Sequence, residues 1–388
     1  MTRRNTLINP WRQTSRWLTT GLTTAAIALS SAMHAQVNGY SFAQTSGTYS
    51  PLVGGTVVAT PTGNALATSV DNAVFEITGF PFTFSYNGVG YTSCYMSSNG
   101  FISFGATAPG AATYTAISTA GTDGIVAAWA GDLNGMFQVN GITSDMRWDV
   151  VGTAPNREVV LQWTDWRPSY TTSITSAYRI NMQIRLQETT NNVVISYGPG
   201  AIVVGTGTYS GTRQIGLRGT TNADYNNRLN AASVLFTAST NGTANTSTQA
   251  WNTTGTPPPG MPSNGQTYTW APPACPAPGG VNVNGITASA ATVNYTCTAC
   301  SGTYVVEYGI APFNTPGSGA TAGAGGTAIS VPASTFSQAL SGLASTTAYD
   351  VYVRRDCGGA GYSNNTTKAT FTTACVASTA PFNENFDS

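Results

Sequence analysis

The lack of any amphipathic helical pattern after residue 35 constrains this 388-residue chain most strongly. Short runs of β-branched and aromatic residues are instead separated by Gly, Asn and Pro, and the chain contains 43 Gly and 20 Pro. Such runs predict short strands bounded by turns. Asn87-Gly88-Val89-Gly90, between two aromatic-rich runs, is typical of a hairpin. The chain is therefore predicted to be an all-β protein.

The clearest predicted strand is 177–187, where apolar and polar residues alternate. This alternation predicts one face on a core and one face in water. The apolar set is Ile180, Met182, Ile184 and Leu186. Further strands are expected at 80–86, 91–96, 123–129, 146–151, 159–163, 193–197, 213–217 and 233–236. This number of strands, over about 230 residues, fits a β-sandwich.

A proline-rich run at 272–278 divides the chain. The Thr/Asn/Gly/Pro-rich residues 238–265 before it form either a long loop or an approach to a last strand at 266–270. Tyr268 and Trp270, which alternate with threonines, favour the strand. We expect tandem β-sandwich domains at 36–271 and 275–374, then the start of an incomplete module at 375–388.

Three runs in the second domain carry a family resemblance. Ala291-Thr-Val-Asn-Tyr-Thr, Tyr304-Val-Val-Glu-Tyr-Gly and the segment 343–355 resemble the second, third and penultimate strands of a fibronectin type III domain. Tyr295 stands where that family usually has Trp. The resemblance implies that Tyr349 forms a tyrosine corner, in which the phenol hydroxyl bonds to the chain upstream.

Other runs resemble extracellular modules. Ile125-Val-Ala-Ala-Trp-Ala-Gly-Asp-Leu, followed by the strand at 181–186, is similar to nidogen-type domains. Ser97-Ser-Asn-Gly-Phe-Ile-Ser-Phe-Gly and Arg213-Gln-Ile-Gly-Leu resemble the β-sandwich that precedes fibronectin type III domains in secreted bacterial proteins. Ala380-Pro-Phe-Asn-Glu-Asn-Phe-Asp-Ser looks like the opening of a jelly-roll module. These resemblances imply a fragment of a longer, multidomain bacterial surface protein.

The N-terminus, residues 1–35, has the pattern of a signal peptide. Four arginines precede a short apolar stretch at 18–30, and cleavage is expected at Ala35-Gln36. The stretch is too short for a membrane span. We therefore expect the protein to be secreted or displayed on the outer cell surface.

Charge limits the partners. The chain has 15 basic and 15 acidic residues, and removal of the four N-terminal arginines leaves a net charge of −4. Lys368 is its only lysine. A chain so poor in cations has no basic stripe to neutralise phosphates, so no nucleic acid or anionic membrane partner is expected.

The only histidine, His34, precedes the expected cleavage site. The mature chain then has no imidazole for a Ser-His-Asp or Cys-His nucleophile, for general base catalysis or for zinc binding. Catalysis would rest on carboxylates, as in glycoside hydrolases. The acidic residues at 132–165 are accounted for by positions in turns and on the solvent faces of strands. No feature of the sequence places two of them opposite each other at a catalytic separation. We expect no catalytic residue in this region and leave a longer parent protein open.

The cysteines of an exported chain favour disulfides. The fibronectin-type resemblance places Cys275, Cys297, Cys300 and Cys357 at one pole, where three pairings are open. Cys297-Thr-Ala-Cys300 also has the spacing of a zinc knuckle or a redox pair, although a structural disulfide is favoured. Cys94 is expected to be a buried small hydrophobe.

Two candidate sites remain. Asp71, Asp123 and Asp132 offer hard oxygen ligands in loops, so structural calcium is left open, and no other cofactor is expected. Trp166 and Tyr170 lie in a Pro-containing segment beside Arg167, where exposed rings could stack on a sugar or anchor a protein. The alternative for these rings is burial in the core.

Together, these patterns favour a non-catalytic secreted or cell-surface modular protein with an adhesion, binding or spacer role. The alternatives are an accessory region of a secreted hydrolase and a carbohydrate-binding module. The expected partner is an extracellular protein or a glycan.

Overall fold

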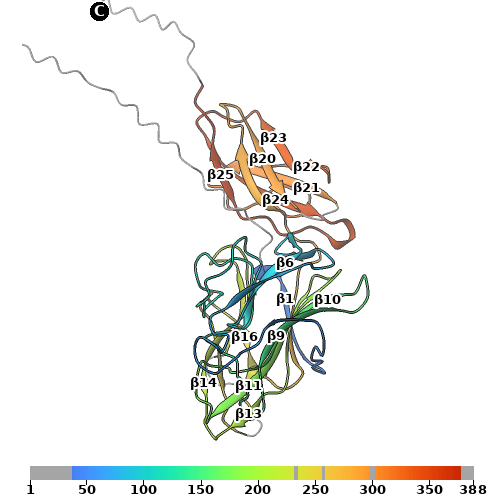
Figure 1. Ribbon diagram of the computed structural model, residues 1–388. Helices are drawn as coiled ribbons and strands as arrows, with labels where there is room; N and C mark the ends of the chain where they lie inside the picture. The colour runs from blue at the N-terminus through green and yellow to red at the C-terminus, as the bar shows by residue number, and fades with distance from the viewer. Residues whose placement is uncertain (1–36, 231–234, 256–257, 298–301, 377–388) are drawn as a thin grey trace, which may run out of the picture. The chain divides into compact units, whose positions relative to one another are not determined.

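A computed structural model describes residues 37–230, 235–255, 258–297 and 302–376. Within these residues the regular elements are β-strands and short 3-10 turns, so the fold is all-β, as predicted (Figure 1). They form two β-sandwiches, each with its own hydrophobic core. The expected signal peptide and residues 377–388 of the expected last module lie outside this part of the chain. No helix in the described ranges is long and apolar enough to cross a membrane.

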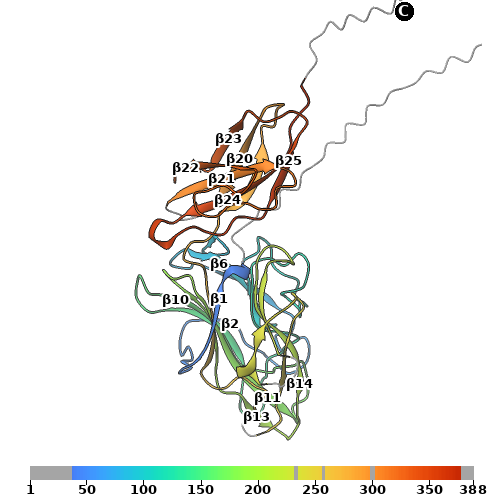
Figure 2. The same ribbon diagram turned by 180° about the vertical axis from the view of Figure 1, so that it is seen from behind.

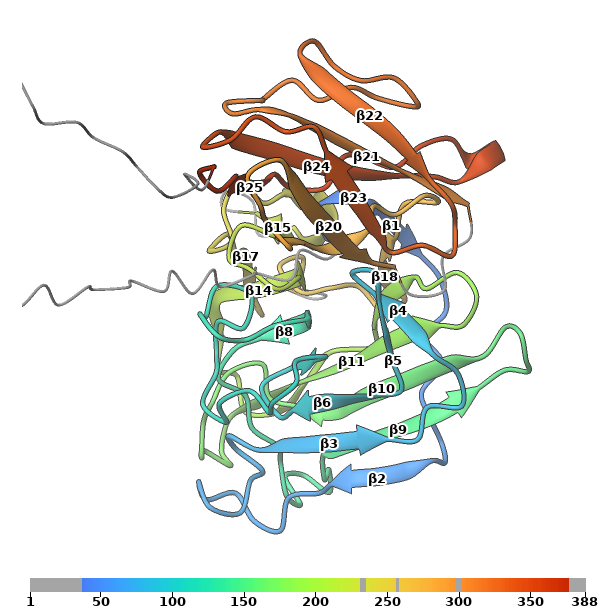
Figure 3. The same ribbon diagram turned by 90° about the horizontal axis from the view of Figure 1, so that it is seen from above.

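The first sheet of the N-terminal sandwich has the strand order β1-β18-β12-β11-β10-β9-β2, and β13 pairs with β11 (Figures 2 and 3). All of these pairs are antiparallel. The strands are β1 (Ser41–Ser46), β2 (Thr56–Ala59), β9 (Asp145–Val151), β10 (Glu158–Trp166), β11 (Ala177–Gln187), β12 (Val193–Tyr197), β13 (Ala201–Val204) and β18 (Gln266–Ala271).

The second sheet has the order β16-β15-β14-β8-β7-β6-β3, and β17 pairs with β14. Its strands are β3 (Val74–Thr78), β6 (Ser93–Ser97), β7 (Phe101–Ser103), β8 (Ile125–Ala130), β14 (Ser210–Arg218), β15 (Tyr225–Leu229), β16 (Thr240–Asn241) and β17 (Gln249–Asn252). The 3-10 turns η1 (Val37–Gly39) and η2 (Phe236–Ala238) complete the domain. Part of the expected strand 233–236 lies outside the described residues, and its last residue, Phe236, is in η2, which corrects that prediction.

Strand β11 has the bounds that its alternating pattern predicts, and its apolar set lies in the core between the sheets. A hairpin is also present where the sequence predicts one, but its bounds differ: Val89 and Gly90, expected in the loop, belong to its second strand, and most of the expected strand 91–96 is β6, which pairs with β3 and β7. Strands β4 (Phe84–Tyr86) and β5 (Val89–Tyr91) are joined at Asn87-Gly88, where φ is 53° and 77°. Two consecutive positive φ angles suit the tight turns that match strand twist, and Asn and Gly adopt them most readily.

Strand β8 is buried along its whole length, which its sequence Ile-Val-Ala-Ala-Trp-Ala allows. Val126 and Ala128 face the core between the sheets. Ile125 and Ala127 pack on the other side against Ala116 and Ile117, from the long connection that precedes β8. A strand covered on both faces is continuously apolar.

Residues 47–55, which we call the strap, join the two edge strands of the first sheet, β1 and β2 (Figure 3). Six steps between neighbouring strands separate these edges, a distance of about 29 Å. Nine residues span at most about 30 Å when fully extended. The strap therefore crosses the outer face of the sheet nearly fully extended.

Contacts along the strap follow the strand order. Its first residue, Gly47, donates from its N–H to the Gly265 carbonyl just before β18 (2.8 Å), where a Cβ on Gly265 would collide with the Gly47 oxygen. Gln183 of β11 donates to the Ser50 carbonyl (2.9 Å), and Gln162 of β10 accepts from the Leu52 N–H (2.8 Å). Because the strap covers them, Gln162 and Gln183 are buried on the face of the sheet that the sequence predicts to be solvated.

The C-terminal sandwich consists of the sheets β19-β20-β23 and β22-β21-β24-β25. The strands are β19 (Gly279–Asn284), β20 (Ala290–Thr296), β21 (Thr303–Ile310), β22 (Gly326–Val331), β23 (Ser337–Ser341), β24 (Ala348–Asp356) and β25 (Ala369–Thr372), and the turn η3 (Gly358–Ala360) lies between β24 and β25 in the chain. The Tyr349 hydroxyl accepts a hydrogen bond from the Ala344 N–H (2.9 Å), five residues upstream. This is the bond of a tyrosine corner.

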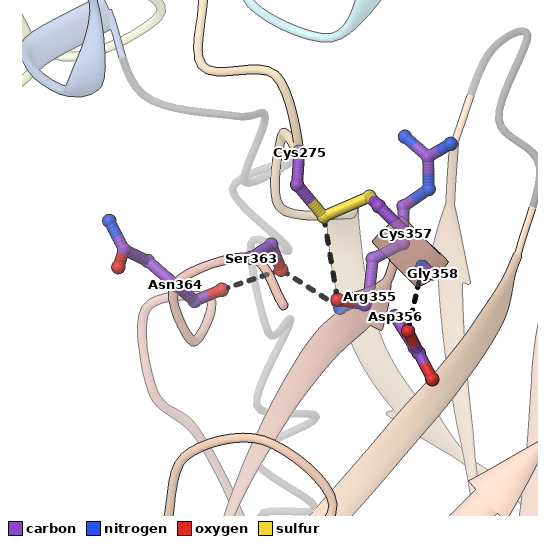
Figure 4. The surroundings of a disulfide bond; sticks show 7 residues. All are labelled: Cys275, Arg355, Asp356, Cys357, Gly358, Ser363 and Asn364. Carbon is purple, nitrogen blue, oxygen red and sulfur yellow. Dashed lines mark hydrogen bonds between the residues drawn. A yellow bond between two sulfur atoms is a disulfide. The ribbon is translucent and has the colours of Figure 1, made fainter. Parts of the chain in front are cut away.

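A disulfide joins Cys275, before β19, to Cys357, after β24 (Figure 4). It connects the chain segments that lead into one sheet and out of the other, with a Cα–Cα distance of 5.8 Å. The sequence leaves three pairings of the four cysteines open. The structure contains the pairing in which Cys275 bonds to Cys357. Cys297 is also disulfide-bonded, and Cys300 lies outside the described residues. Cys94 is a buried free thiol, and Cys375 is exposed and free.

Asp224 links three segments of the N-terminal sandwich. Its carboxylate accepts hydrogen bonds from the Asn38 N–H in η1 (3.2 Å) and from the Asn87 side chain at the hairpin turn (3.1 Å). Burial raises its pKa to about 6, although these hydrogen bonds oppose the shift. Ionisation of Asp224 is therefore less favourable in the folded state than in the unfolded chain.

We expect Asp224→Asn to remove a pH-dependent loss of stability. The folded-state pKa lies above the unfolded value, so the folded state holds a proton between about pH 4 and pH 6 and stability falls as pH rises through this window. Two pKa units correspond to about 3 kcal/mol. The amide that the substitution introduces can donate to the Asn87 Oδ1, which has no partner among the described residues. Urea unfolding followed by tryptophan fluorescence from pH 4 to pH 7 should show a flatter profile for Asp224→Asn than for wild type.

The matched control is Glu76→Gln, at an exposed carboxylate of β3. Its profile should follow that of the wild type. If Asp224→Asn retains the wild-type slope between pH 4 and pH 6, burial of Asp224 is not the source of the pH dependence.

Candidate functional site

The pairing of four strands brings two of the predicted acidic loops to one end of the second sheet. Strand β3 begins there, β6 turns into β7 there, and β8 ends there. Asp71 precedes β3, and Asp132 follows β8. The paired strand β14 brings Arg213 to the same end, next to the partner of Ala130. Asp71, Asn72, Asn99, Asp132 and Arg213 are called the acidic loop cluster below.

Asn99, in the turn between β6 and β7, holds the two acidic loops together. Its side chain is fully buried and donates to the Asn72 side-chain oxygen (3.1 Å) and the Ala111 carbonyl (2.9 Å). Its own oxygen accepts from the Leu133 N–H (3.2 Å). The relative positions of the two acids are therefore fixed by hydrogen bonds to one side chain.

The acids share an electrostatic environment that opposes ionisation. Burial raises the pKa of Asp71 to about 6, and the charge of Asp132 adds to the shift. Burial also raises the pKa of Asp132, which Arg213 partly counters. In each acid, one buried carboxylate oxygen has no hydrogen-bond partner among the described residues. These two oxygens are the unused acceptors of the cluster.

Arg213 is the cation of the cluster. Burial lowers its pKa to about 10, and its guanidinium lies over the Trp251 ring, 5.2 Å from the centroid. Its side chain also donates to the Pro168 carbonyl (2.5 Å). No local pattern in the sequence marks Arg213 as a site residue, because its interaction with Asp132 joins β14 to a loop more than 80 residues earlier.

Asp123 does not belong to this cluster, which corrects the expected three-acid set. It precedes β8 whereas Asp132 follows it, and six strand residues separate these ends by roughly 20 Å. The side chain of Asp123 lies near Arg218, at 3.9 Å. Across the described residues, no group of three or more His, Cys, Asp or Glu side chains is placed to hold a metal ion.

Trp166 is in the core, and its ring is not available to stack on a sugar, which corrects that candidate. A bulge between Trp163 and Trp166 in β10 explains this position. Asp165 adopts φ 55° there, so the alternation of faces shifts by one residue and both tryptophans point inward. The Trp166 indole N–H donates to the Asp145 carbonyl (2.9 Å).

Arg167 is also buried, and only Tyr170 keeps partial exposure. The Arg167 guanidinium donates to the Asn64 side chain (3.0 Å) and to the Thr171 carbonyl. The Tyr170 N–H donates to the Asp132 carbonyl (2.8 Å), which places this loop beside the acidic loop cluster. Arg167 therefore fixes loops and is not free to contact a ligand.

The N-terminal sandwich lies in a region of the chain that matches a known family. A family model described as NIDO related matches residues 39–272. The chain belongs to the NIDO-related family. The NIDO-related domain covers the N-terminal sandwich and ends in the proline run, in agreement with the nidogen-type resemblance of residues 125–133. No curated protein matches the chain.

Two FN3 domains and a redesigned β-sandwich protein are among the solved structures similar to part of the chain. The fn3 domain of the human collagen alpha-1(XX) chain is 23% identical, covers 27% of this chain and 90% of its own, and has a TM-score of 0.22. A crystal structure of the human collagen XX FN3 domain is 22% identical over 26% of this chain and 93% of its own, with a TM-score of 0.21. A redesigned β-sandwich protein is 21% identical. The match covers 27% of this chain and 96% of that protein, with a TM-score of 0.22.

Proposed function

We propose that this chain is a non-catalytic, secreted modular protein, in which the NIDO-related domain binds an extracellular partner and the C-terminal sandwich is a disulfide-bonded spacer. The Cys275–Cys357 bond carries the proposal, because structural disulfides persist in oxidising compartments outside the cytosol. Membership of the NIDO-related family and the signal-peptide pattern at 1–35 support the same location.

Three carboxylates on the outer face of the first sheet support a non-catalytic role. Asp145, Glu158 and Asp165 each form an ion pair with an arginine. Glycoside hydrolysis needs two carboxyl groups that face each other across the substrate at a fixed separation. Carboxylates that are each engaged by a neighbouring guanidinium serve the stability of the sheet.

Expression of the full chain in a bacterium tests the location. We expect the exported protein to begin at Gln36 by N-terminal sequencing, with Cys275 and Cys357 protected from thiol alkylation and Cys375 modified. A chain that stays in the cytoplasm with an intact N-terminus and alkylated Cys275 and Cys357 would contradict the proposal.

Calcium at the acidic loop cluster is a second proposal, which the two unused carboxylate oxygens favour. Calcium takes six to eight oxygen ligands, so amide and backbone oxygens and water would complete the shell around Asp71 and Asp132. A bound divalent ion would also favour ionised carboxylates. Arg213 opposes this arrangement, because its charge already acts on Asp132.

Thermal unfolding with and without calcium tests this second proposal. If calcium binds, millimolar Ca²⁺ should raise the unfolding midpoint of the NIDO-related domain relative to EDTA, because a ligand that binds only the folded state stabilises it. Asp71→Asn/Asp132→Asn should lose this response, and Asp123→Asn should retain it. An unchanged wild-type midpoint would exclude a stabilising ion at this site.

A further inference from the structure

A pocket of about 230 Å³ lies between the strap and the outer face of the first sheet. Thr48 and Ser50 of the strap form one wall. The remaining lining comes from four adjacent strands of the sheet: Glu158 of β10, Gln183 and Arg185 of β11, Val194 and Ser196 of β12, and Thr267 of β18. The pocket is distinct from the acidic loop cluster and from the Trp166 loop.

Hydrogen bonds fix the floor of this pocket. Gln183 is fully buried and donates to the Gln162 side chain (2.6 Å) as well as to Ser50 of the strap. Its oxygen accepts from Arg185 (2.8 Å). Arg185 in turn donates through Nε to Glu158 (2.7 Å), which also accepts from Gln187 (2.8 Å). A ligand would meet side chains that are already ordered, which lowers the entropic cost of binding.

The chemistry of the lining selects the ligand class. The charges of Arg185 and Glu158 balance each other, so the pocket favours neither an anion nor a cation. The hydroxyl groups of Thr48, Ser50 and Ser196 can both donate and accept hydrogen bonds, and the Thr267 hydroxyl, which donates to the Gly265 carbonyl (3.2 Å), can accept one. Val194 and the threonine methyl groups add a small apolar surface. Alternating hydroxyl and C–H groups on a compact neutral ring complement such a lining.

The volume of the pocket suits a ligand with a single ring. Sites for drug-sized molecules commonly measure about 300–1,000 Å³, and this pocket is smaller. No lining residue is aromatic, so hydrogen bonds and not ring stacking would carry the contact. Weak binding of a single ring is expected from such a site.

We propose that this pocket binds one ring of a neutral saccharide. The site lies on the sheet face beneath the strap, away from the segment with Trp166 and Tyr170 for which the sequence predicts sugar contacts. The inference goes beyond the proposed function, since binding by purified protein does not depend on export. Failure of either proposal therefore leaves the other standing.

Saturation-transfer NMR on the purified chain 36–388 tests the proposal. The probes are glucose, galactose, mannose and N-acetylglucosamine at millimolar concentration, with glucuronate and glucosamine as charged counterparts. We expect signals from at least one neutral sugar and no preference for its charged counterpart. Affinity electrophoresis in gels with neutral polysaccharides then separates binding of free sugar from binding of a glycan chain.

Two variants locate the site. Thr48→Trp places a bulky side chain on the pocket wall, and Ser196→Val replaces a lining hydroxyl by two methyl groups. Both should weaken sugar binding at least tenfold with an unchanged circular dichroism spectrum. Thr172→Trp, at an exposed threonine elsewhere in the domain, should bind as wild type does. The absence of any neutral-sugar signal, binding only of charged sugars, or full binding by folded Ser196→Val would each overturn the proposal.

Discussion

Replacement of Cys275 and Cys357 by alanine is expected to lower the free energy of unfolding of the C-terminal sandwich by about 4 kcal/mol. The two cysteines are 82 residues apart in sequence. In the chain-entropy account, a cross-link over a loop of this length removes about 4 to 5 kcal/mol of conformational freedom from the unfolded chain. For a domain of this size, the midpoint should fall by about 20 °C.

Calorimetry of the chain 36–388 measures this effect, with tryptophan fluorescence as an internal reference. All six tryptophans after residue 35 lie between 129 and 270, so fluorescence reports the N-terminal sandwich alone. Its transition should not move in the double variant. Cys375→Ser, at an exposed free thiol, is the matched control and should leave both transitions unchanged. A drop of only a few degrees would show that the bond contributes little beyond the packed core.

The periodic strands are the part of the fold that the sequence predicts best. Strand β11 matches its predicted bounds because eleven alternating residues leave one register that buries the apolar face. Strand β12 is likewise found at 193–197. The Asn87-Gly88 turn was predictable because few residues adopt two consecutive positive φ angles.

Long-range contacts explain what local patterns could not predict. Regular alternation after Trp163 would place Trp166 on the outer face, and the bulge at Asp165 turns it inward. Gln183 has the pattern of a solvated residue, yet the strap from a distant part of the chain covers it. Both errors concern candidate sites, Trp166 as a sugar contact and Gln183 in the pocket lining. In both cases the position of the side chain is decided by parts of the chain that come together only in the folded sheet.

The acidic residues show the same limit. Asp71, Asp123 and Asp132 are equivalent as loop carboxylates in the sequence, and nothing local tells which two meet. Strand pairing decides it, because β3 begins and β8 ends at one end of the sheet while Asp123 lies at the other. The membership of the cluster is therefore set by topology and not by composition.

Breaking the buried ion pair of the C-terminal sandwich should have a comparable effect to removing the disulfide. Glu307 of β21 and Arg354 of β24 are both fully buried, and their nearest atoms are 2.5 Å apart. The pair organises the Gly-rich connection between β21 and β22. Glu307 accepts from the Gly317 (3.0 Å) and Gly323 (2.6 Å) N–H groups, and Arg354 donates to the Gly319 (2.6 Å) and Thr321 (2.8 Å) carbonyls.

Arg354→Met is expected to cost about 3 to 5 kcal/mol, because it leaves the Glu307 carboxylate buried without its counter-ion. The double variant Glu307→Gln/Arg354→Met buries no charge and should be more stable than Arg354→Met alone. Calorimetry of the two single variants and the double variant gives the coupling energy, and limited proteolysis should show cleavage at 315–325 in Arg354→Met. Arg179→Met breaks the ion pair with Asp165, in which both side chains are partly exposed, and should cost at most about 1 kcal/mol. If the effects of Glu307→Gln and Arg354→Met are additive, the two side chains contribute independently, through packing and not through their ion pair. The order of the Gly-rich connection would then depend on other contacts.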